Sequence, residues 1–228
     1  MSQKDSLRVG LVGLGQVCQA VHYPGFSRIP QVEIAALCDA DQDLLARRQD
    51  EWHIERGYSD YARFLREVKP DAVAIATPNV HHRELILAAL EAGCHVLCEK
   101  PLGMNHPETA QVYQAARDSG RRHMIAFTYR FVPAMTYLQA LVKNGELGQI
   151  RHARFQRLQD WGEFSIGWRQ YREKAGSGEL GDMGIHRIDF AEELLGPIQA
   201  VSGAARQVLP RDKTAAGQTC PPQDVEDW

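Results

Sequence analysis

The sequence predicts an α/β fold whose first half is a doubly wound parallel sheet. Short apolar runs alternate with helical stretches throughout residues 7–127, the order that gives a parallel sheet with helices on both faces. One run, Ala72–Ala76, is apolar without interruption, as expected of a strand covered on both sides. A glycine turn, Gly13-Leu14-Gly15, directly follows the first run. These three observations predict the fold class before any chemistry is considered.

Each element of the first half can be assigned from its pattern and its end signals. Asp41 is placed to cap the second helix, and Gly93 to end the fourth. Strands are expected at residues 7–12, 32–38, 72–76, 94–98 and 123–127, with helices reaching about residue 27, starting after residue 41, and spanning 61–68, 81–92 and 107–119.

The second half loses this alternation. A helix is expected at Pro133–Asn144, and a half-exposed strand at Ile150–Leu158, where polar and apolar residues alternate. A glycine-rich segment introduces a further helix that ends at Gly196, and Ala200–Ala205 is expected to form another strand. This pattern predicts an α+β region after the α/β one. The expected domains are residues 1–128 and residues 129–228.

The composition is that of an ordinary globular protein. Of 228 residues, 44% are hydrophobic and 24% charged, and the net charge of −3 argues against a nucleic-acid-binding protein. No apolar stretch approaches the ~20 residues that span a bilayer. The polar start Met1–Asp5 leads straight into a strand, so we expect no signal peptide and a cytoplasmic protein. The five scattered cysteines favour reduced thiols over disulfides or a metal site.

The turn Gly13–Cys18 has the form of a dinucleotide-binding (Rossmann) loop. Gly13 permits a tight turn, Gly15 lets the backbone approach a pyrophosphate, and the helix that follows offers free N–H groups to its charge. Cys18 replaces the third glycine of the usual pattern, but its side chain is small enough for close packing of helix and strand. The alternative is a glycine turn in an α/β domain that binds no nucleotide.

A carboxylate ends the second expected strand. Asp39 lies 24 residues after Gly15 (39 − 15). A carboxylate at this point can accept hydrogen bonds from ribose hydroxyls, and it would repel the 2′-phosphate of NADP. The neighbouring Ala40 and Asp41 supply no cation that could hold that phosphate. The sequence therefore favours NAD over NADP.

A lysine stands at the end of a buried strand. Lys100 follows the apolar run Cys94–Cys98, within the tripeptide Glu99-Lys100-Pro101. Ligands of open α/β sheets bind in the crevice beyond the carboxyl ends of the strands. A cation at this position is therefore expected to serve a ligand or a reaction.

The segment Gly176–Asp189 carries a second group of ionisable residues. If the segment is helical, Asp182, His186 and Asp189 share a stripe at spacings i, i+4 and i+7, flanked by apolar residues. Three ionisable groups exceed what a solvated face requires, which favours a functional role over a hydrogen-bonded core histidine. Other histidines, such as His22, show no partner pattern and are expected to be ordinary core or surface residues.

Taken together, these motifs resemble the glucose–fructose oxidoreductase/inositol dehydrogenase (Gfo/Idh/MocA) family. The resemblance extends to about residue 200, and it departs from the family pattern at Cys18, Cys94 and Ser177, none of which is a catalytic position. The residues that carry it are the glycine loop, Thr77-Pro78-Asn79 with His82, Ala92-Gly93 before Glu99-Lys100-Pro101, Trp168-Arg169, and Gly176–Asp189.

The resemblance implies an NAD(P)-dependent enzyme that oxidises a sugar, a polyol or a related secondary alcohol, or reduces the corresponding ketone. His186 is then the general acid/base, because histidine titrates near neutral pH. Asp182 accepts hydrogen bonds from substrate hydroxyls, and Lys100 stabilises alkoxide character on the reacting oxygen. Arg169 either contacts the substrate or forms a structural salt bridge. Cofactor contacts are implied at Gly13, Gly15, Gln16, Val17, Asp39, Thr77, Pro78, Asn79, His82, Glu99 and Lys100.

The resemblance also implies a second domain built on a mostly antiparallel sheet, whose face joins subunits in a homo-oligomer. The sequence stops at Trp228, about where a further strand is expected, so we expect a C-terminally shortened member with an incomplete sheet. A fragment, a frameshifted or split gene, and a reduced second domain are the three explanations. A non-catalytic nucleotide-binding or regulatory protein, or an inactive fragment, is the alternative function, and the sequence does not identify the substrate.

Overall fold

The computed structural model describes residues 6–228, and the chain divides into two compact units. The first ends at Ala126, and the second is Phe127–Trp228. The polar start Met1–Asp5, on which the expectation of no signal peptide rests, lies outside the described residues. Within the described part of the chain, no helix is long and apolar enough to cross a membrane.

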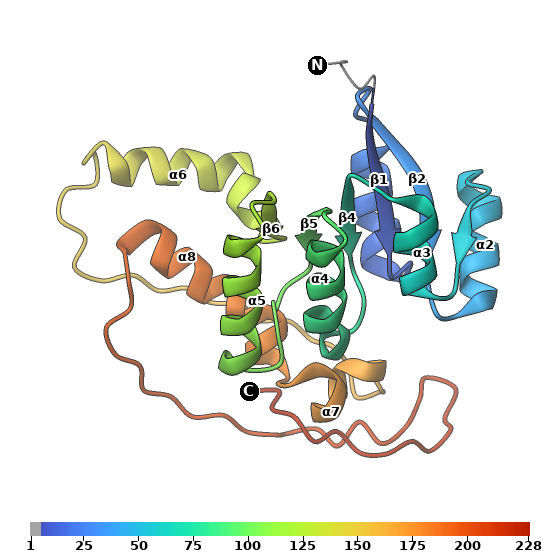
Figure 1. The fold of residues 1–228 in the computed structure, drawn as a ribbon. Coiled ribbons are helices and arrows are strands. Elements are labelled where there is room, and N and C mark those ends of the chain that lie inside the picture. Colours follow the sequence, from blue (N-terminus) through green and yellow to red (C-terminus); the bar gives the residue numbers. More distant parts are fainter. Residues whose placement is uncertain (1–5) are drawn as a thin grey trace. The chain divides into compact units, whose positions relative to one another are not determined.

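The first unit is built on a six-stranded parallel sheet (Figure 1). Its strands are β1 Leu7–Val12, β2 Val32–Cys38, β3 Gly57–Tyr58, β4 Ala72–Ile75, β5 His95–Cys98 and β6 His123–Ile125. Their spatial order is β3-β2-β1-β4-β5-β6, so the direction of winding reverses between β1 and β4. This is the strand order of doubly wound dinucleotide-binding folds, in which ligands bind beyond the carboxyl strand ends near the point of reversal.

The helices of this unit follow the sequence prediction. They are η1 Cys18–His22 (a π-helical turn) with α1 Tyr23–Phe26, α2 Gln42–Trp52, α3 Tyr61–Val68, η2 Asn79–His81 (a 3-10 turn) with α4 His82–Glu91, and α5 His106–Asp118. Asp41 caps α2 as predicted, because its side chain accepts a hydrogen bond from Leu44 N at 3.0 Å. Gly93, with φ 80°, follows the end of α4. Both end signals are confirmed.

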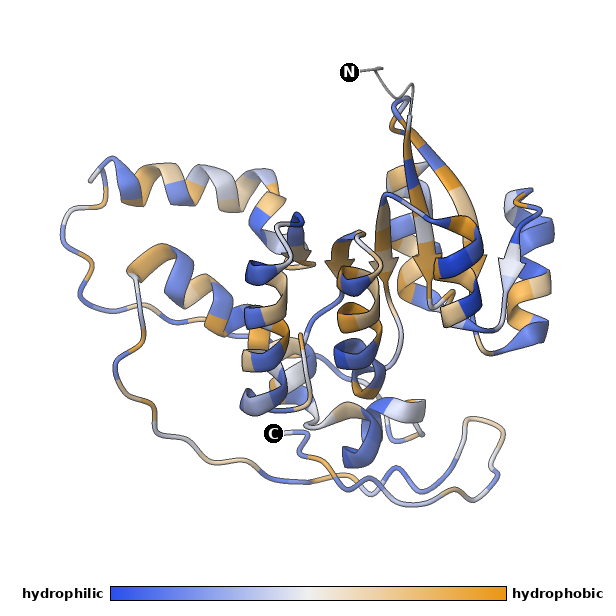
Figure 2. Ribbon diagram, viewed as in Figure 1, coloured by the Kyte–Doolittle hydropathy of each residue, from blue (hydrophilic) through white to orange (hydrophobic). Residues whose placement is uncertain are grey.

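Two hydrophobic clusters bury the sheet. Phe64 of α3, Ile86 of α4 and Val112 of α5 belong to one cluster, together with strand residues. Trp52 of α2 and Cys18 of η1 belong to the other, with a different set of strand residues. Because successive strand side chains point to opposite faces, the two clusters cover the two faces of the sheet. Figure 2 shows the hydrophobic colouring gathered on the strands, as expected of a parallel sheet covered on both sides.

The second unit consists of short helices and extended chain. Its helices are η3 Thr128–Phe131, α6 Pro133–Lys143, η4 Gly167–Gln170, α7 Arg172–Ala175, η5 Leu180–Gly184 (a π-helical turn) and α8 Ile185–Leu195. Two of them were expected: α6, and the helix that ends before Gly196, which the structure divides into η5 and α8.

The mostly antiparallel sheet expected in the second unit is not confirmed. Ile150–Leu158 and Ala200–Ala205 form no strand, and the pairing described within residues 127–228 is one isolated antiparallel bridge between Lys213 and Thr219. An alternating pattern becomes a strand only where a neighbouring strand satisfies its backbone N–H and C=O groups. Neither segment has such a neighbour here, so both remain extended chain.

Candidate active site

The glycine turn joins the ends of three strands. Gly13, after β1, has φ 82° and donates its N–H to Cys38 O at the end of β2, at 2.9 Å. A Cβ at Gly13 would lie 2.7 Å from backbone atoms of Ala76 and Thr77, which follow β4. The left-handed conformation and the close approach to the β4 end therefore both require glycine.

The backbone beyond Gly13 is open at the start of a helix. Helical structure begins at Gln16 and continues through Val17 into η1. A Cβ at Gly15 would meet no atom within 4 Å, so the chain at this point faces open space. Cys18 is 1% exposed in the core, as its small size predicts, and burial raises the pKa of its thiol to about 12. An unobstructed backbone before a helix fits the pyrophosphate of a dinucleotide.

Asp39 braces this turn from the end of β2. One carboxylate oxygen, Oδ2, accepts a hydrogen bond from Leu14 N at 2.7 Å, and Oδ1 accepts one from Asp41 N at 2.9 Å. The side chain is half-buried at the edge of the sheet where the ribose contact is predicted. Since a carboxylate has about four acceptor sites, further acceptor capacity remains for ribose hydroxyls.

The tripeptide Thr77-Pro78-Asn79 follows β4 next to the glycine turn. Nε2 of the His82 imidazole lies 3.0 Å from Thr77 O. The hydroxyl Oγ1 of Thr77 is buried, and no hydrogen bond is assigned to it among the described residues. Asn79 opens η2 and is 7% exposed. These residues therefore lie at the reversal of the strand order, as predicted for a cofactor-facing segment.

Lys100 lies at the same edge of the sheet, after β5, and is half-buried. Backbone pairing fixes the segment on both sides. Glu99 N donates to Ile75 O of β4 at 2.9 Å, and Ala126 N, after β6, donates to Cys98 O at 2.8 Å. The lysine therefore follows a strand end held between two neighbouring strand ends, where ligands of this fold bind.

Glu99 and His82, both predicted to contact the cofactor, make hydrogen bonds inside the first unit. Glu99 Oε1 lies 2.9 Å from Nε2 of His22, with side-chain exposures of 13% and 5%. His82 is 0% exposed, and its Nδ1 lies 2.7 Å from Pro101 O. No pattern in the sequence indicated a role for His22. Its partner is 77 positions away in the chain, and no local spacing indicates such a pair.

In the second unit, α8 carries His186 in its first turn. The imidazole is 5% exposed, and two aromatic rings stand edge-on to it. The ring centroids of Tyr129 and Phe127 lie 4.8 Å and 5.9 Å from that of His186. These contacts limit the orientations of the imidazole and shield it from water.

At the start of the helix that carries Asp182, the backbone passes so close to Glu226 that a glycine is required. Gly178 must be glycine, because a Cβ there would overlap the carbonyl oxygen of Glu226. The carboxylate of Glu226 accepts hydrogen bonds from Gly178 N at 2.8 Å and Leu180 N at 3.2 Å, and its carbonyl accepts one from Glu179 N at 3.0 Å. Glu226 thereby satisfies the first N–H groups of the helix whose opening turn contains Asp182.

The predicted stripe of three ionisable residues is realised in part. A π-helical turn, Leu180–Gly184, replaces the regular helix expected between Asp182 and His186. The third member, Asp189, is 6% exposed and accepts hydrogen bonds from Arg130 Nε at 3.0 Å and Arg130 Nη2 at 2.5 Å. These bonds raise the pKa of the Arg130 guanidinium. Asp189 is therefore half of an ion pair that anchors α8.

Arg169 lies in η4, with its guanidinium carbon 4.6 Å from the ring centre of Trp168. The next residue, Gln170, is 0% exposed, and its side chain holds this turn by hydrogen bonds. Its Oε1 accepts a hydrogen bond from Ile166 N at 3.0 Å, and its Nε2 donates to Arg211 O at 3.2 Å. The turn that carries Arg169 is thus held in place by the hydrogen bonds of the buried Gln170 side chain.

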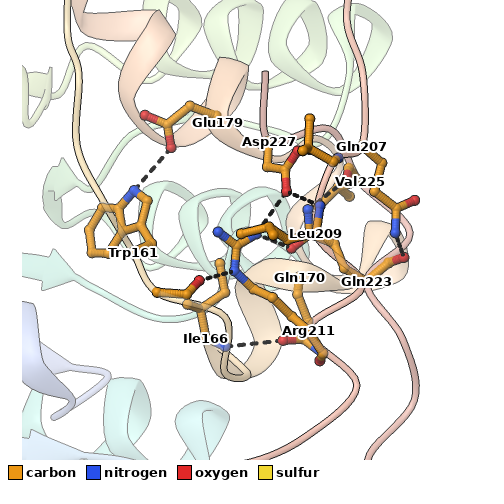
Figure 3. Close-up of polar contacts among 12 residues, drawn as sticks. Trp161, Ile166, Gln170, Glu179, Gln207, Leu209, Arg211, Gln223, Val225 and Asp227 are labelled. Carbon is orange, nitrogen blue, oxygen red and sulfur yellow. Dashed lines mark hydrogen bonds and ion pairs between the residues drawn. The ribbon is translucent and has the colours of Figure 1, made fainter.

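A buried arginine ties the last part of the chain to this turn (Figure 3). Arg211 is 4% exposed and donates to Gln223 Oε1 at 2.6 Å, to Asp227 Oδ2 at 3.1 Å and to Gly162 O at 3.2 Å. The polar residues of this region follow no period, so their sequence predicts neither a helix nor a strand. The hydrogen-bond network gives the loop a fixed course.

Each unit therefore assembles part of the predicted site. The first gathers the glycine turn, Asp39, the residues after β4 and Lys100 at the carboxyl edge of one sheet. The second carries Asp182 and His186 on adjoining helical turns.

Comparison with protein families identifies both units. Residues 7–127 match the family described as "Oxidoreductase family, NAD-binding Rossmann fold", and residues 135–228 match the "GFO/IDH/MocA C-terminal domain".

Individual relatives agree with this assignment. Levoglucosan dehydrogenase of Pseudarthrobacter phenanthrenivorans is 33% identical over 224 residues, which cover 93% of this chain and 57% of that protein. D-glucoside 3-dehydrogenase of Escherichia coli is 35% identical over 195 residues, 83% of this chain and 54% of that protein. A solved structure of levoglucosan dehydrogenase in complex with NADH and levoglucosan matches with a TM-score of 0.87 and 31% identity, covering 97% of this chain and 62% of that one. The chain thus spans less than two thirds of each relative, and it belongs to the Gfo/Idh/MocA oxidoreductase family.

Proposed function

We propose that this protein is an NAD-dependent dehydrogenase that oxidises a secondary hydroxyl of a sugar or polyol, or reduces the corresponding ketone. The observation that carries the proposal is the carboxyl edge of the parallel sheet, which holds an open glycine turn, a carboxylate and Lys100 together. The names of two relatives, levoglucosan dehydrogenase and D-glucoside 3-dehydrogenase, support a sugar as the substrate.

The residues of the first unit fit a bound dinucleotide. The open backbone at Gly15 and the helix start at Gln16 and Val17 would hold its pyrophosphate. Asp39 would accept a ribose hydroxyl with the acceptor capacity that Leu14 and Asp41 leave, and its negative charge favours NAD over NADP. Thr77, Pro78 and Asn79 would line the nicotinamide end. When bound, the oxidised cofactor supplies the acceptor for the substrate's hydride.

The proton of the reacting hydroxyl is assigned to His186. An imidazole titrates near neutral pH, so it can accept this proton during oxidation and return it during reduction. Its low exposure and aromatic surroundings favour transfer to the substrate over exchange with bulk water. Asp182, in the turn before it, would orient the substrate by accepting hydrogen bonds from neighbouring hydroxyls.

Lys100 is assigned to the reacting oxygen. As hydride leaves the carbon, the oxygen gains alkoxide character before the carbonyl forms, and a cation stabilises that charge. Arg169 is proposed as a substrate contact, supported by the fixed position of its turn on the buried side chain of Gln170.

The test combines NAD titration with a turnover assay on levoglucosan, methyl glucosides and inositols. We expect NAD-dependent formation of NADH, with Lys100→Ala lowering kcat by about 10²-fold or more and His186→Ala lowering it by about 10²–10⁴-fold. Matched controls are Lys143→Ala and His152→Ala, which alter exposed residues of the same types in the second unit. Tight NAD binding with no turnover on the whole panel would instead favour a non-catalytic nucleotide-binding protein.

The proposal also includes the setting of the enzyme. The five free cysteines of the chain support a reducing compartment, the cytoplasm. Large apolar side chains exposed in the second unit, such as Phe131 at 68% and Tyr137 at 66%, support a homo-oligomer. Light scattering coupled to size-exclusion chromatography tests that state, and a monomer at all concentrations would refute it.

A further inference from the structure

Two buried histidines hold the tripeptide Glu99-Lys100-Pro101 on either side of its lysine. His22, in η1, contacts the side chain of Glu99, and His82, at the start of α4, contacts the carbonyl of Pro101. The two histidines come from different helices, one after β1 and the other after β4. Lys100 is therefore flanked in sequence by two residues that are each fixed to a neighbouring helix.

The contact on the Glu99 side is a close, shielded pair. Nε2 of His22 lies 2.9 Å from Oε1 of Glu99, and the side chains are 5% and 13% exposed. A hydrogen bond to a carboxylate shielded from water is stronger than one at the surface. Because η1 continues the helix that begins after the glycine turn, this pair links the proposed pyrophosphate site to the lysine segment.

The contact on the Pro101 side is fully buried. His82 is 0% exposed, and its two ring nitrogens lie 2.7 Å from Pro101 O and 3.0 Å from Thr77 O. Both neighbours are acceptors, so the single imidazole spans the segments that follow β4 and β5. Burial lowers the pKa of His82, which keeps the ring neutral. A neutral ring donates through one nitrogen at a time, and the contact to Pro101 O is the shorter of the two.

Burial also limits what His82 can do. A side chain with no exposed surface offers a cofactor no face to contact, and its polar atoms are both directed at backbone carbonyls. The cofactor contact inferred from the family resemblance is therefore better explained as support for the segments on which the cofactor would lie.

We propose that His22 and His82 are positioning residues that hold Glu99 and Pro101, and through them fix the placement of Lys100. The proposal rests on the proposed function in one respect, the action of Lys100 on the reacting oxygen. A misplacement of about 1 Å at such a group can cost about 10²-fold in rate. Loss of either histidine is expected to lower kcat while the affinity for NAD changes little.

The two ring nitrogens of His82 can be tested separately. The amide of asparagine reaches about as far as Nδ1 of histidine, and that of glutamine about as far as Nε2. His82→Asn therefore retains the link to Pro101, whereas His82→Gln retains only the link to Thr77. For the other histidine, His22→Gln retains a donor to Glu99, and His22→Leu removes it. The matched control is Ile86→Val, a buried change on the same helix as His82 that does not touch the tripeptide.

Hydrogen–deuterium exchange provides a readout that needs no turnover. In the full chain, the peptide from Glu99 to Met104 should exchange faster in His82→Gln and His22→Leu than in the parent protein. His82→Asn, His22→Gln and Ile86→Val should leave its exchange close to the parent's. The kinetic readout should agree. Only His82→Gln and His22→Leu should lower kcat, by about tenfold or more, and the KM for NAD of every variant should stay within about threefold of the parent's.

The outcomes separate this inference from the proposed function. Faster exchange in the predicted variants, together with a parent protein that oxidises no sugar, would support the two histidines as braces and refute the enzyme. Equal exchange in His82→Asn and His82→Gln, or unchanged exchange in His22→Leu, would overturn the positioning role whatever the activity of the parent. Changed exchange with unchanged kcat in an active enzyme would also overturn it.

Discussion

The amide of Leu14 donates to the carboxylate of Asp39 at 2.7 Å, so the residue predicted to bind ribose also holds the glycine turn. This bond joins the ends of β1 and β2, which lie next to each other in the sheet. Replacing Asp39 therefore changes both the glycine turn and the charge beside the proposed ribose site. The choice of cofactor and the shape of its loop are therefore coupled.

Replacing Asp39 should change cofactor choice and affinity together. Asp39→Ala is expected to weaken NAD binding about tenfold, equivalent to about 1.4 kcal/mol, and to reduce the preference for NAD over NADP because the repulsive charge is gone. Titration calorimetry with both nucleotides checks this. Asp60→Ala is the control, since the Asp60 side chain caps α3 by accepting a hydrogen bond from Arg63 N. Unaltered nucleotide preference in Asp39→Ala would contradict the ribose assignment.

The two glycines of the turn should respond differently to alanine. Gly13→Ala places a Cβ 2.7 Å from the backbone after β4 at a φ of 82°, and should lower the free energy of unfolding by at least about 1 kcal/mol. Gly15→Ala enters open space, so its stability should stay within about 0.5 kcal/mol of the parent while NAD binding weakens. Urea denaturation and NAD titration measure the two effects. Equal stabilities would show that the turn tolerates a side chain at Gly13.

The buried imidazole of His82 should make stability depend on pH. Because burial lowers its pKa in the folded state, the unfolded chain binds the proton more readily, and stability rises with pH in this window. The contribution is complete above about pH 6.5 and is lost as the pH falls below it, with a slope of at most about 1.4 kcal/mol per pH unit. Urea denaturation at a series of pH values measures this slope.

The matched comparison for that slope uses His82→Asn and a buried apolar change on the same helix. His82→Asn should remove the part of the slope due to His82, and Ile86→Val, which removes no titrating group, should leave the slope as it is. A slope that persists in His82→Asn would assign the titration to another group.

The ion pair between Arg130 and Asp189 should stabilise the second unit. Asp189→Ala leaves Arg130 without its main partner and is expected to lower the free energy of unfolding by about 1–3 kcal/mol. The loss stays in this range because Arg130 is 41% exposed, so water can solvate its guanidinium. Glu193→Gln, which changes an exposed partner of the same arginine at 3.2 Å, should cost less than about 1 kcal/mol. Urea denaturation of both variants decides this, and equal losses would contradict the dominant role of Asp189.

The sequence was sufficient for the first unit because its pattern is local. The expected strands Leu7–Val12 and Val32–Cys38 form with the same bounds, since uninterrupted apolar runs suit a sheet buried on both faces. The two-residue strand β3 was missed, because so short a run carries no period. His22 was set aside for another reason: its partner is distant in sequence, and spacing rules reach only one or two helical turns.

The structure of the second unit could be predicted only in part from patterns in the sequence. Alternation at Ile150–Leu158 predicted a strand, but alternation describes one chain segment and says nothing about the neighbour it needs. The buried Arg211 network has no pattern at all, because its residues are polar and its bonds connect distant positions. The placement of Asp182 and His186 on adjoining helical turns was more predictable, since the two residues are close in sequence.

The most direct test of the account follows the hydride itself. Perdeuterated methyl glucoside or levoglucosan is incubated with the full chain and NAD, and the reduced cofactor is analysed by mass spectrometry. We expect one deuterium in each NADH formed, with formation greatly reduced in Lys100→Ala and His186→Ala. NAD that binds but acquires no deuterium from any sugar or polyol of the panel would contradict it.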